Sequence, residues 1–128
     1  LGLAERIGLV LAPPLIFPAV SQGALGIECR ADDTVTRDLL AQLACPVTTA
    51  EVLAERSLLR TLRAGCHAPL GVWCSVEQQQ LTLTGVLLSH DGSTRLEQTV
   101  CGMTTEPEVA GQQVAEQLLG CGAESLLQ

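Results

Sequence analysis

The residues with the clearest chemical potential lie in one short stretch, where a cysteine follows three regularly spaced arginines. Arg56, Arg60 and Arg63 are four and three positions apart, which places them on one face of a helix. Cys66 follows in a connection that leads to a strand pattern. Nearby positive charge favours the nucleophilic thiolate, whereas the partial negative charge of a helix C-terminus opposes it. The stretch indicates either a reactive thiol or a small buried cysteine beside a solvated arginine face.

Two residues around this cysteine predict a tight loop. Gly65 follows the last position of the helical pattern, and glycine can end a helix in the left-handed conformation without a side-chain clash. Pro69 then prevents a return to helix. We therefore expect Cys66 to be held at a junction between a helix and a strand.

Other cysteine chemistries fit this sequence less well. The six cysteines are scattered and form no Cys-x-x-Cys pair, so we expect no metal site, even from Cys66, His67 and Cys74. His67 is a sequence neighbour of Cys66, and such neighbours rarely form a catalytic Cys-His pair. A redox protein would need a resolving cysteine, for which Cys74 is the only near candidate. His90 is expected in a solvated turn. We see no secretory segment in the sequence, so we do not expect a disulfide framework.

The bulk composition favours one small globular unit with an aliphatic core. Of the 128 residues 47% are hydrophobic, with one Trp, one Phe and no Tyr. The formal net charge of −7 argues against nucleic acid as a partner, because phosphate binding needs a basic surface. The longest apolar run, residues 9–20, is too short for a membrane span and contains three prolines. We expect a cytoplasmic protein with reduced thiols.

The first third of the chain predicts a helix, a strand and a second helix. An apolar stripe over residues 3–11 is helical, Pro13 and Pro14 end it, and residues 15–20 are extended. Residues 24–30 are predicted to form a strand after a glycine-containing turn. Asp32, Asp33 and Thr34 are typical of a helix start. The buried stripe of that helix is expected to comprise Val35, Leu39, Leu40 and Leu43.

The remaining elements are two helices around three strands. Thr48 and Glu51 have the spacing of a capping box for a helix that buries Leu53, Leu58 and Leu62. After the cysteine loop the period changes to two, which predicts strands over residues 72–76, 81–87 and 96–103. The Asp-Gly pair within 90–93 indicates a hairpin turn. A final helix begins at Pro107 and stops at 120–122, before a short last turn.

Two stretches of this chain resemble the family of hydroxymethylbilane synthase (porphobilinogen deaminase), in its bacterial-like form. Arg-Ala-Gly-Cys-His-Ala-Pro-Leu-Gly at 63–71 resembles the family's Gly-Gly-Cys-x-x-Pro segment, with Ala64 in place of the first glycine. Pro-Ala-Val-Ser-Gln-Gly-Ala-Leu-Gly-Ile-Glu-Cys-Arg at 18–30 resembles Pro-Ala-Val-Gly-Gln-Gly-Ala-x-Gly-x-Glu, with Ser21 in place of a glycine. Ala-Glu-Arg at 54–56 fits as well.

The resemblance covers nearly the whole chain but only about the last two fifths of the enzyme. It implies an α+β fold: a small domain whose three-stranded antiparallel sheet is covered on one face by helices, preceded by pieces of two upstream α/β domains. Residues 1–20 would be the tail of the second domain, 21–44 a return segment of the first, and 45–128 the C-terminal cofactor-attachment domain. The chain begins with leucine inside a helical pattern, so we expect it to be a fragment.

The family's activity, a transferase reaction of tetrapyrrole (haem) biosynthesis, would follow. Such enzymes join four porphobilinogen units with release of ammonia, on a dipyrromethane primer. The resemblance implies that Cys66 tethers this cofactor by a thioether and that Gln22, Gly23 and Ala24 are cofactor contacts. The partners implied are porphobilinogen and the growing polypyrrole, with no nucleic acid and no membrane, in a monomeric full-length enzyme.

The family's catalytic aspartate and its substrate-binding arginines would lie upstream, so the resemblance implies no catalytic residue in this chain and no turnover by the chain alone. An alternative is a stand-alone binding or regulatory module that lacks the catalytic domains.

Overall fold

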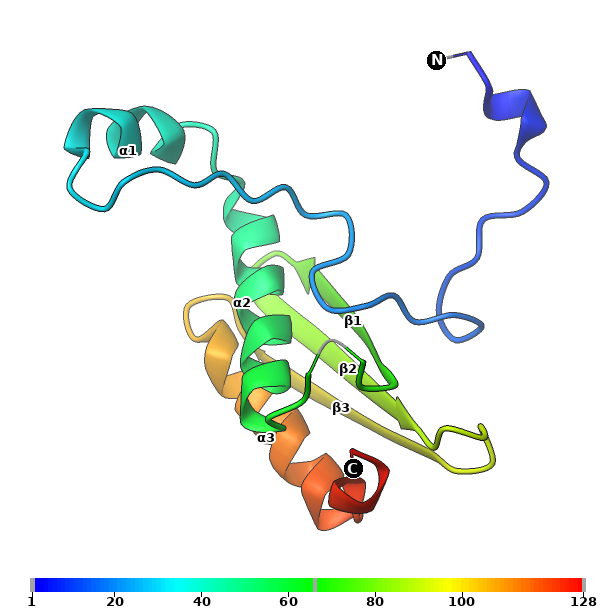
Figure 1. Cartoon of the computed structure of the whole chain (residues 1–128). Coiled ribbons are helices and arrows are strands. Elements are labelled where there is room, and N and C mark those ends of the chain that lie inside the picture. Colours follow the sequence, from blue (N-terminus) through cyan, green and yellow to red (C-terminus); the bar gives the residue numbers. More distant parts are fainter. Residues whose placement is uncertain (1, 66, 128) are drawn as a thin grey trace.

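The second half of the chain forms a three-stranded antiparallel sheet with two long helices on one face (Figure 1). The computed structural model describes residues 2–65 and 67–127. The elements, in order, are η1 (Ala4–Arg6), α1 (Thr34–Ala41), α2 (Pro46–Thr61), β1 (Leu70–Glu77), β2 (Gln80–Leu88), β3 (Arg95–Met103), α3 (Pro107–Gly120) and η2 (Ala123–Leu126). The predicted α+β class, with helices on one face of the sheet, is confirmed.

The sheet has the order β1-β2-β3, so sequential strands pair as a meander. Leu70 pairs with Leu87 across β1 and β2, and Leu83 with Val100 across β2 and β3. The predicted turn between β2 and β3 is present. The carboxylate of Asp91 accepts hydrogen bonds there from the Ser89 hydroxyl at 2.6 Å and the Ser93 amide at 3.1 Å.

The core lies between this sheet and the pair of helices α2 and α3. Its largest fully buried apolar side chains are Leu58, Val72, Leu81, Leu83, Leu87, Val114 and Leu118. The two helices approach closely because Gly111 has no side chain: a Cβ there would lie 2.2 Å from the carbonyl oxygen of Ala54. The Ser57 hydroxyl is buried at this contact and donates to the Glu108 carbonyl at 2.8 Å.

Helix α2 ends with a left-handed residue, but not at the predicted position. Arg63 has the positive φ of 50°, whereas Gly65 was expected to have it. The Arg63 amide donates to the Arg60 carbonyl and the Ala64 amide to the Leu59 carbonyl, at 3.1 and 3.2 Å. This pair of bonds is a Schellman motif. The motif forms at Arg63 because Ala64 and Leu59 both pack against the core there.

The start of α2 also differs from the prediction. The helix begins at Pro46, with Cys45 as its N-cap and no side-chain capping bond. Proline is favoured at this first position because its fixed φ suits a helix and its missing N–H is not needed there. The capping box of Thr48 and Glu51 is therefore wrong, since both lie inside the helix. Leu53 was expected to be buried and is exposed.

Most predicted elements before residue 45 are absent or lack their expected packing. Residues 3–11 contain only the short η1, and residues 24–30 form no strand. Asp33 does cap α1 by accepting from the Thr36 amide at 3.0 Å, as predicted. The stripe expected to be buried is not: Val35 is 71% exposed, Leu39 60% and Leu43 71%, and Leu40 is half-buried. A strand needs a pairing partner and an amphipathic helix a packing surface, and the described residues supply neither.

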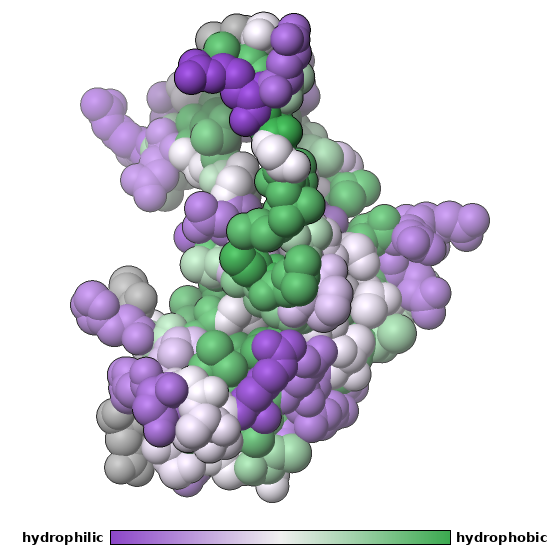
Figure 2. Space-filling view, turned by 90° about the vertical axis from the view of Figure 1, so that its right-hand side faces the viewer, coloured by the Kyte–Doolittle hydropathy of each residue, from purple (hydrophilic) through white to green (hydrophobic). Residues whose placement is uncertain are grey.

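The N-terminal segment lies along one side of the molecule and carries much apolar surface. Figure 2 views that side and shows a band of hydrophobic surface running down it. Leu9, Val10, Leu15 and Ile16 are all exposed there. None of the described helices is long and apolar enough to cross a membrane.

Candidate functional site

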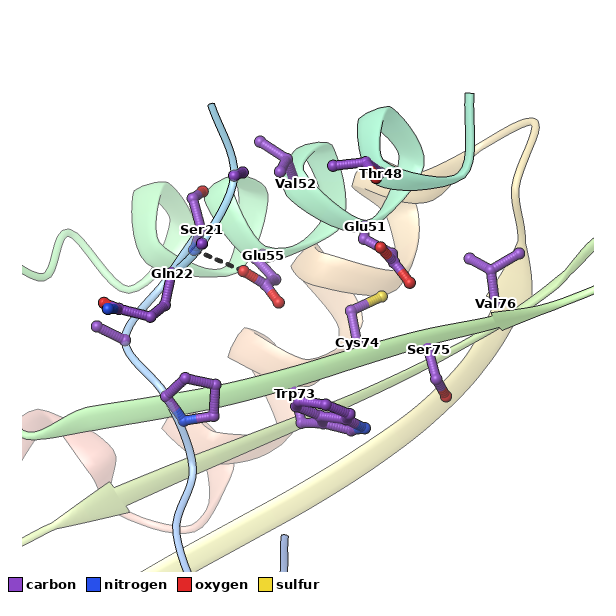
Figure 3. Close-up of a pocket in the computed structure, with 14 residues that line it drawn as sticks. Ser21, Gln22, Thr48, Glu51, Val52, Glu55, Trp73, Cys74, Ser75 and Val76 are labelled. Atoms are coloured by element: carbon purple, nitrogen blue, oxygen red, sulfur yellow. Dashed lines mark hydrogen bonds between the residues drawn. The ribbon is translucent and has the colours of Figure 1, made fainter. Parts of the chain in front are cut away.

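A groove of about 430 Å³ lies between the N-terminal segment, α2 and β1 (Figure 3). It is lined by Pro18, Ala19 and 21–24 of the N-terminal segment, Thr48, Glu51, Val52 and Glu55 of α2, and 73–76 of β1. Three of the predicted site residues, Gln22, Gly23 and Ala24, thus lie together on the wall of this groove.

Residues 17–24, which we call the strap, are fixed to β1 at one end. The Val72 amide donates to the Pro18 carbonyl at 2.8 Å, so the strap bonds to an edge strand of the sheet. Phe17 lies directly over Gly71, where an added Cβ would be 2.6 Å from the Phe17 Cβ. The guanidinium of Arg95 lies 5.4 Å from the centroid of the Phe17 ring, within cation–π range.

The other end of the strap is fixed to α2. The Ser21 amide donates to Oε2 of Glu55 at 2.6 Å, which is the dashed line in Figure 3. Ser21 has a positive φ of 60°, unusual for a residue with a side chain. Turns on either side of it are closed by the bonds Gln22 N–H to Ala19 O at 3.0 Å and Ala24 N–H to Ser21 O at 3.1 Å.

The inner wall of the groove is acidic. Glu51 and Glu55 are one turn apart on the same face of α2, and Cys74 of β1 lies opposite them (Figure 3). Burial raises the pKa of Glu55, and the Ser21 amide opposes this effect; burial also raises the pKa of Glu51. No described residue of the lining is basic. Anionic groups are therefore disfavoured on this wall.

Cys74 is held as a neutral thiol. Burial, together with the charges of Glu55 and Glu51, raises its pKa to about 12. Because the thiolate is the nucleophile, a thiol with this pKa is unreactive at neutral pH. Cys74 is thus a poor candidate for the resolving cysteine that a redox protein would need.

Cys66, the predicted attachment residue, lies outside the described residues, so its predicted thiolate character stays a prediction. The chain on either side is anchored: the Ala68 amide donates to the Gly65 carbonyl at 3.1 Å, and the Leu88 amide to the Pro69 carbonyl at 3.0 Å. Of the three arginines before it, Arg60 forms an exposed ion pair with Glu108 at 3.2 Å.

Sequence reasoning missed the acidic wall. Glu51 was interpreted as part of a capping box, and Glu55 only as part of a matching tripeptide. Their spacing of four residues does predict a shared helix face. No sequence signal indicated that this face would meet the strap, because that contact joins residues 34 positions apart.

Comparison with known proteins agrees with this architecture. The sequence profile of the porphobilinogen deaminase C-terminal domain matches residues 49–120, and that of the porphobilinogen deaminase dipyrromethane cofactor binding domain matches residues 1–38. A small α+β domain thus follows a piece of a second kind of domain. The chain belongs to the porphobilinogen deaminase family.

Curated relatives support the same assignment along the whole chain. The porphobilinogen deaminase of Nostoc sp. is 42% identical over 127 residues, that of Syntrophotalea carbinolica 41% over 127, and that of Gloeobacter violaceus 43% over 128. Each alignment covers 99% of this chain. The chain spans 39–40% of the length of these relatives.

Proposed function

We propose that the chain is the C-terminal part of a hydroxymethylbilane synthase, a transferase that joins four porphobilinogen units with release of ammonia. The observation that carries this proposal is the match of two profiles of this one family, in order along the chain, at residues 1–38 and 49–120. The likeness of 42% to the Nostoc relative over 99% of the chain supports it. The product would serve tetrapyrrole, including haem, biosynthesis.

In this proposal Cys66 holds the dipyrromethane cofactor through a thioether. When bound, the cofactor supplies the pyrrole on which the growing chain is built, and the thioether keeps that chain attached through successive additions. The contribution of this chain is to hold the tether in place. Arg63 ends α2 in a Schellman motif, and Pro69 bonds to the end of β2, so both ends of the loop are fixed to the core.

The groove fits such a cofactor only on its outer side. The acetate and propionate groups of dipyrromethane are anionic, and the wall with Glu51 and Glu55 would repel them. Gln22 and Gly23 are exposed and neutral, and Gln22 points away from Cys74 (Figure 3). The proposed contacts of Gln22, Gly23 and Ala24 therefore use the outer face of the strap. Basic partners for the carboxylates would come from the rest of the enzyme.

The proposed domain division is supported by where the apolar residues lie. Residues 45–128 would be the cofactor-attachment domain, 21–44 a return segment of the first domain, and 1–20 the tail of the second. Leu25 in the return segment is 95% exposed, and the apolar face of α1 is uncovered. Such residues would pack against upstream domains. Without those domains the chain would not turn over substrate, and the complete enzyme would be a cytoplasmic monomer acting on porphobilinogen and the growing polypyrrole.

A chimaera tests the function directly. The part of the Nostoc relative that precedes its match would be joined to residues 1–128 of this chain, and the product assayed for activity and intact mass. We expect an active protein with a dipyrromethane adduct that a Cys66→Ser variant loses. Cys101→Ser, at an exposed free thiol, is the matched control and should keep the adduct.

Two results would contradict the proposal. An active chimaera with serine at position 66 would refute the tether, and a folded chimaera without adduct or activity would refute the function. If the chimaera does not fold, the intact mass of the protein from its native cells decides. A species heavier than 13.4 kDa that carries the adduct supports the proposal, and one of this mass without it favours a stand-alone binding module.

A further inference from the structure

We propose that Glu55 is a positioning residue that holds the strap, and with it Gln22, Gly23 and Ala24, against the C-terminal domain. Its functional meaning rests on the proposed function, in which these three residues contact the cofactor. Glu55 would not itself touch the cofactor, because it lies on the inner wall of the groove. Its role would be to fix the backbone that does.

The first support is geometric. Among the described residues, the bond from the Ser21 amide to Glu55 is the only side-chain hydrogen bond made to residues 17–24. It falls between the two turns that shape the strap, immediately before Gln22. The anchor at Pro18 lies three residues earlier, and Val20 between them packs against the core. The carboxylate of Glu55 is therefore the polar anchor nearest to the candidate contact residues.

The second support is the backbone of Ser21. Its φ of 60° is a conformation that glycine adopts freely but that a residue with a Cβ adopts at a cost. The Ser21 hydroxyl oxygen is also buried without a hydrogen-bond partner. Both features disfavour the observed strap, so an interaction must hold it. Ser21 makes a bond within its own turn to the Ala24 amide, and the short bond to Glu55 is its bond to a distant element.

The third support is that the bond persists where charge is disfavoured. Glu51 faces Glu55 from the same helix, Cys74 faces it from β1, and the strap brings no cation to the groove. Half-buried beside another carboxylate, Glu55 keeps its charge-assisted bond to the Ser21 amide. Such bonds are stronger than neutral ones.

Amide hydrogen exchange of the 128-residue chain, measured by NMR and corrected for intrinsic rates, tests this inference. In Glu55→Ala we expect protection of the amides of residues 21–24 to fall by about tenfold or more. Glu55→Gln, whose amide oxygen can still accept from Ser21, should retain part of the protection. Glu51→Gln is the matched control one turn away and should retain the protection of the native chain.

The amides of β2, which lie in the core, report whether each variant remains folded. If they stay protected while residues 21–24 are equally protected in Glu55→Ala and the native chain, the inference is overturned. An equal loss in Glu51→Gln and Glu55→Ala would also overturn it, because the effect would then come from charge in the groove. These measurements use no cofactor, so they are independent of whether Cys66 carries an adduct.

Discussion

Residues 45–127 and residues 2–44 have similar apolar patterns but very different burial. In the first region the apolar faces of α2, α3 and the strands meet one another and form a core. In the second region the stripe of α1 and the apolar residues of 24–30 remain exposed. The comparison teaches that a periodic pattern specifies which face an element can bury, whereas burial itself depends on a partner.

The largest expected effect is a loss of stability on truncating a leucine, which should be large in the first region and small in the second. Leu58→Ala should destabilise the chain by about 2–5 kcal/mol, because it leaves a cavity at a fully buried site between α2 and the sheet. The matched change Leu39→Ala in α1 should cost less than about 0.5 kcal/mol, because that side chain is exposed. Urea unfolding followed by Trp73 fluorescence measures both. Equal losses would show that α1 packs as tightly as α2.

A second substitution tests the close contact between helices α2 and α3, which belongs to the first region. Gly111→Ala should cost about 1–3 kcal/mol, because its Cβ would meet the backbone of Ala54. Gly120→Ala, at the end of the same helix, has open space around it and should be neutral or slightly stabilising. Thermal unfolding of the two variants checks this. An unchanged melting temperature for Gly111→Ala would contradict the close approach of α2 and α3.

The pH dependence sharpens the comparison at the groove, where the regions meet. The raised pKa values of Glu51 and Glu55 mean that these groups contribute stability below about pH 4.5, which is lost as pH rises through their folded values. Glu55→Gln should therefore flatten the fall in stability above that pH. Urea midpoints over a pH series test this, and an unchanged slope would contradict the burial of the carboxyl.

At lower pH two other carboxylates contribute to stability with the opposite pH dependence. The pKa of Asp33 is lowered by its bonds to Thr36, and that of Asp91 is lowered to about 2 by Ser89 and Ser93. Stability from these two carboxylates is present above about pH 3.8 and is lost as pH falls through their folded values.

The smallest effect lies wholly in the N-terminal region. Asp33→Ala should reduce the helix content of α1, because the Thr36 amide loses its acceptor, while leaving the unfolding of the core unchanged. Asp32→Ala removes the neighbouring carboxylate, which makes no such bond, and is the control. Chemical shifts of residues 34–41 give the helix content. A loss of core stability in Asp33→Ala would mean that α1 is coupled to the domain.

Much of the fold could be predicted from local signals. The alternation of Val72, Cys74 and Val76, the Asp-Gly turn and the stop at Gly122 each act within a few residues, and each is confirmed. The missed features depend on contacts distant in sequence. Arg63 rather than Gly65 ends α2 because Ala64 packs on the core, and Glu55 meets Ser21 across 34 positions of sequence.

The candidate site was predictable to a lesser extent. Motif resemblance located Gln22, Gly23 and Ala24, which the structure brings together on the groove wall. It gave no indication of the acidic wall opposite, and the roles of Cys66 and of these three residues stay predictions. A motif identifies residues that match, whereas the charge around them depends on side chains brought there by folding.

Helix α2 carries both the anchor of the strap and the start of the cysteine loop, which sets a spacing. Glu55 and the C-cap residue Leu62 are seven residues apart on one continuous helix, or about 10 Å along its axis. Inserting one residue between them would lengthen this by about 1.5 Å and rotate the loop by about 100° relative to the strap. The number of residues in α2 therefore sets the distance and rotation between the anchor of the strap and the cysteine loop, whichever side chains the helix carries.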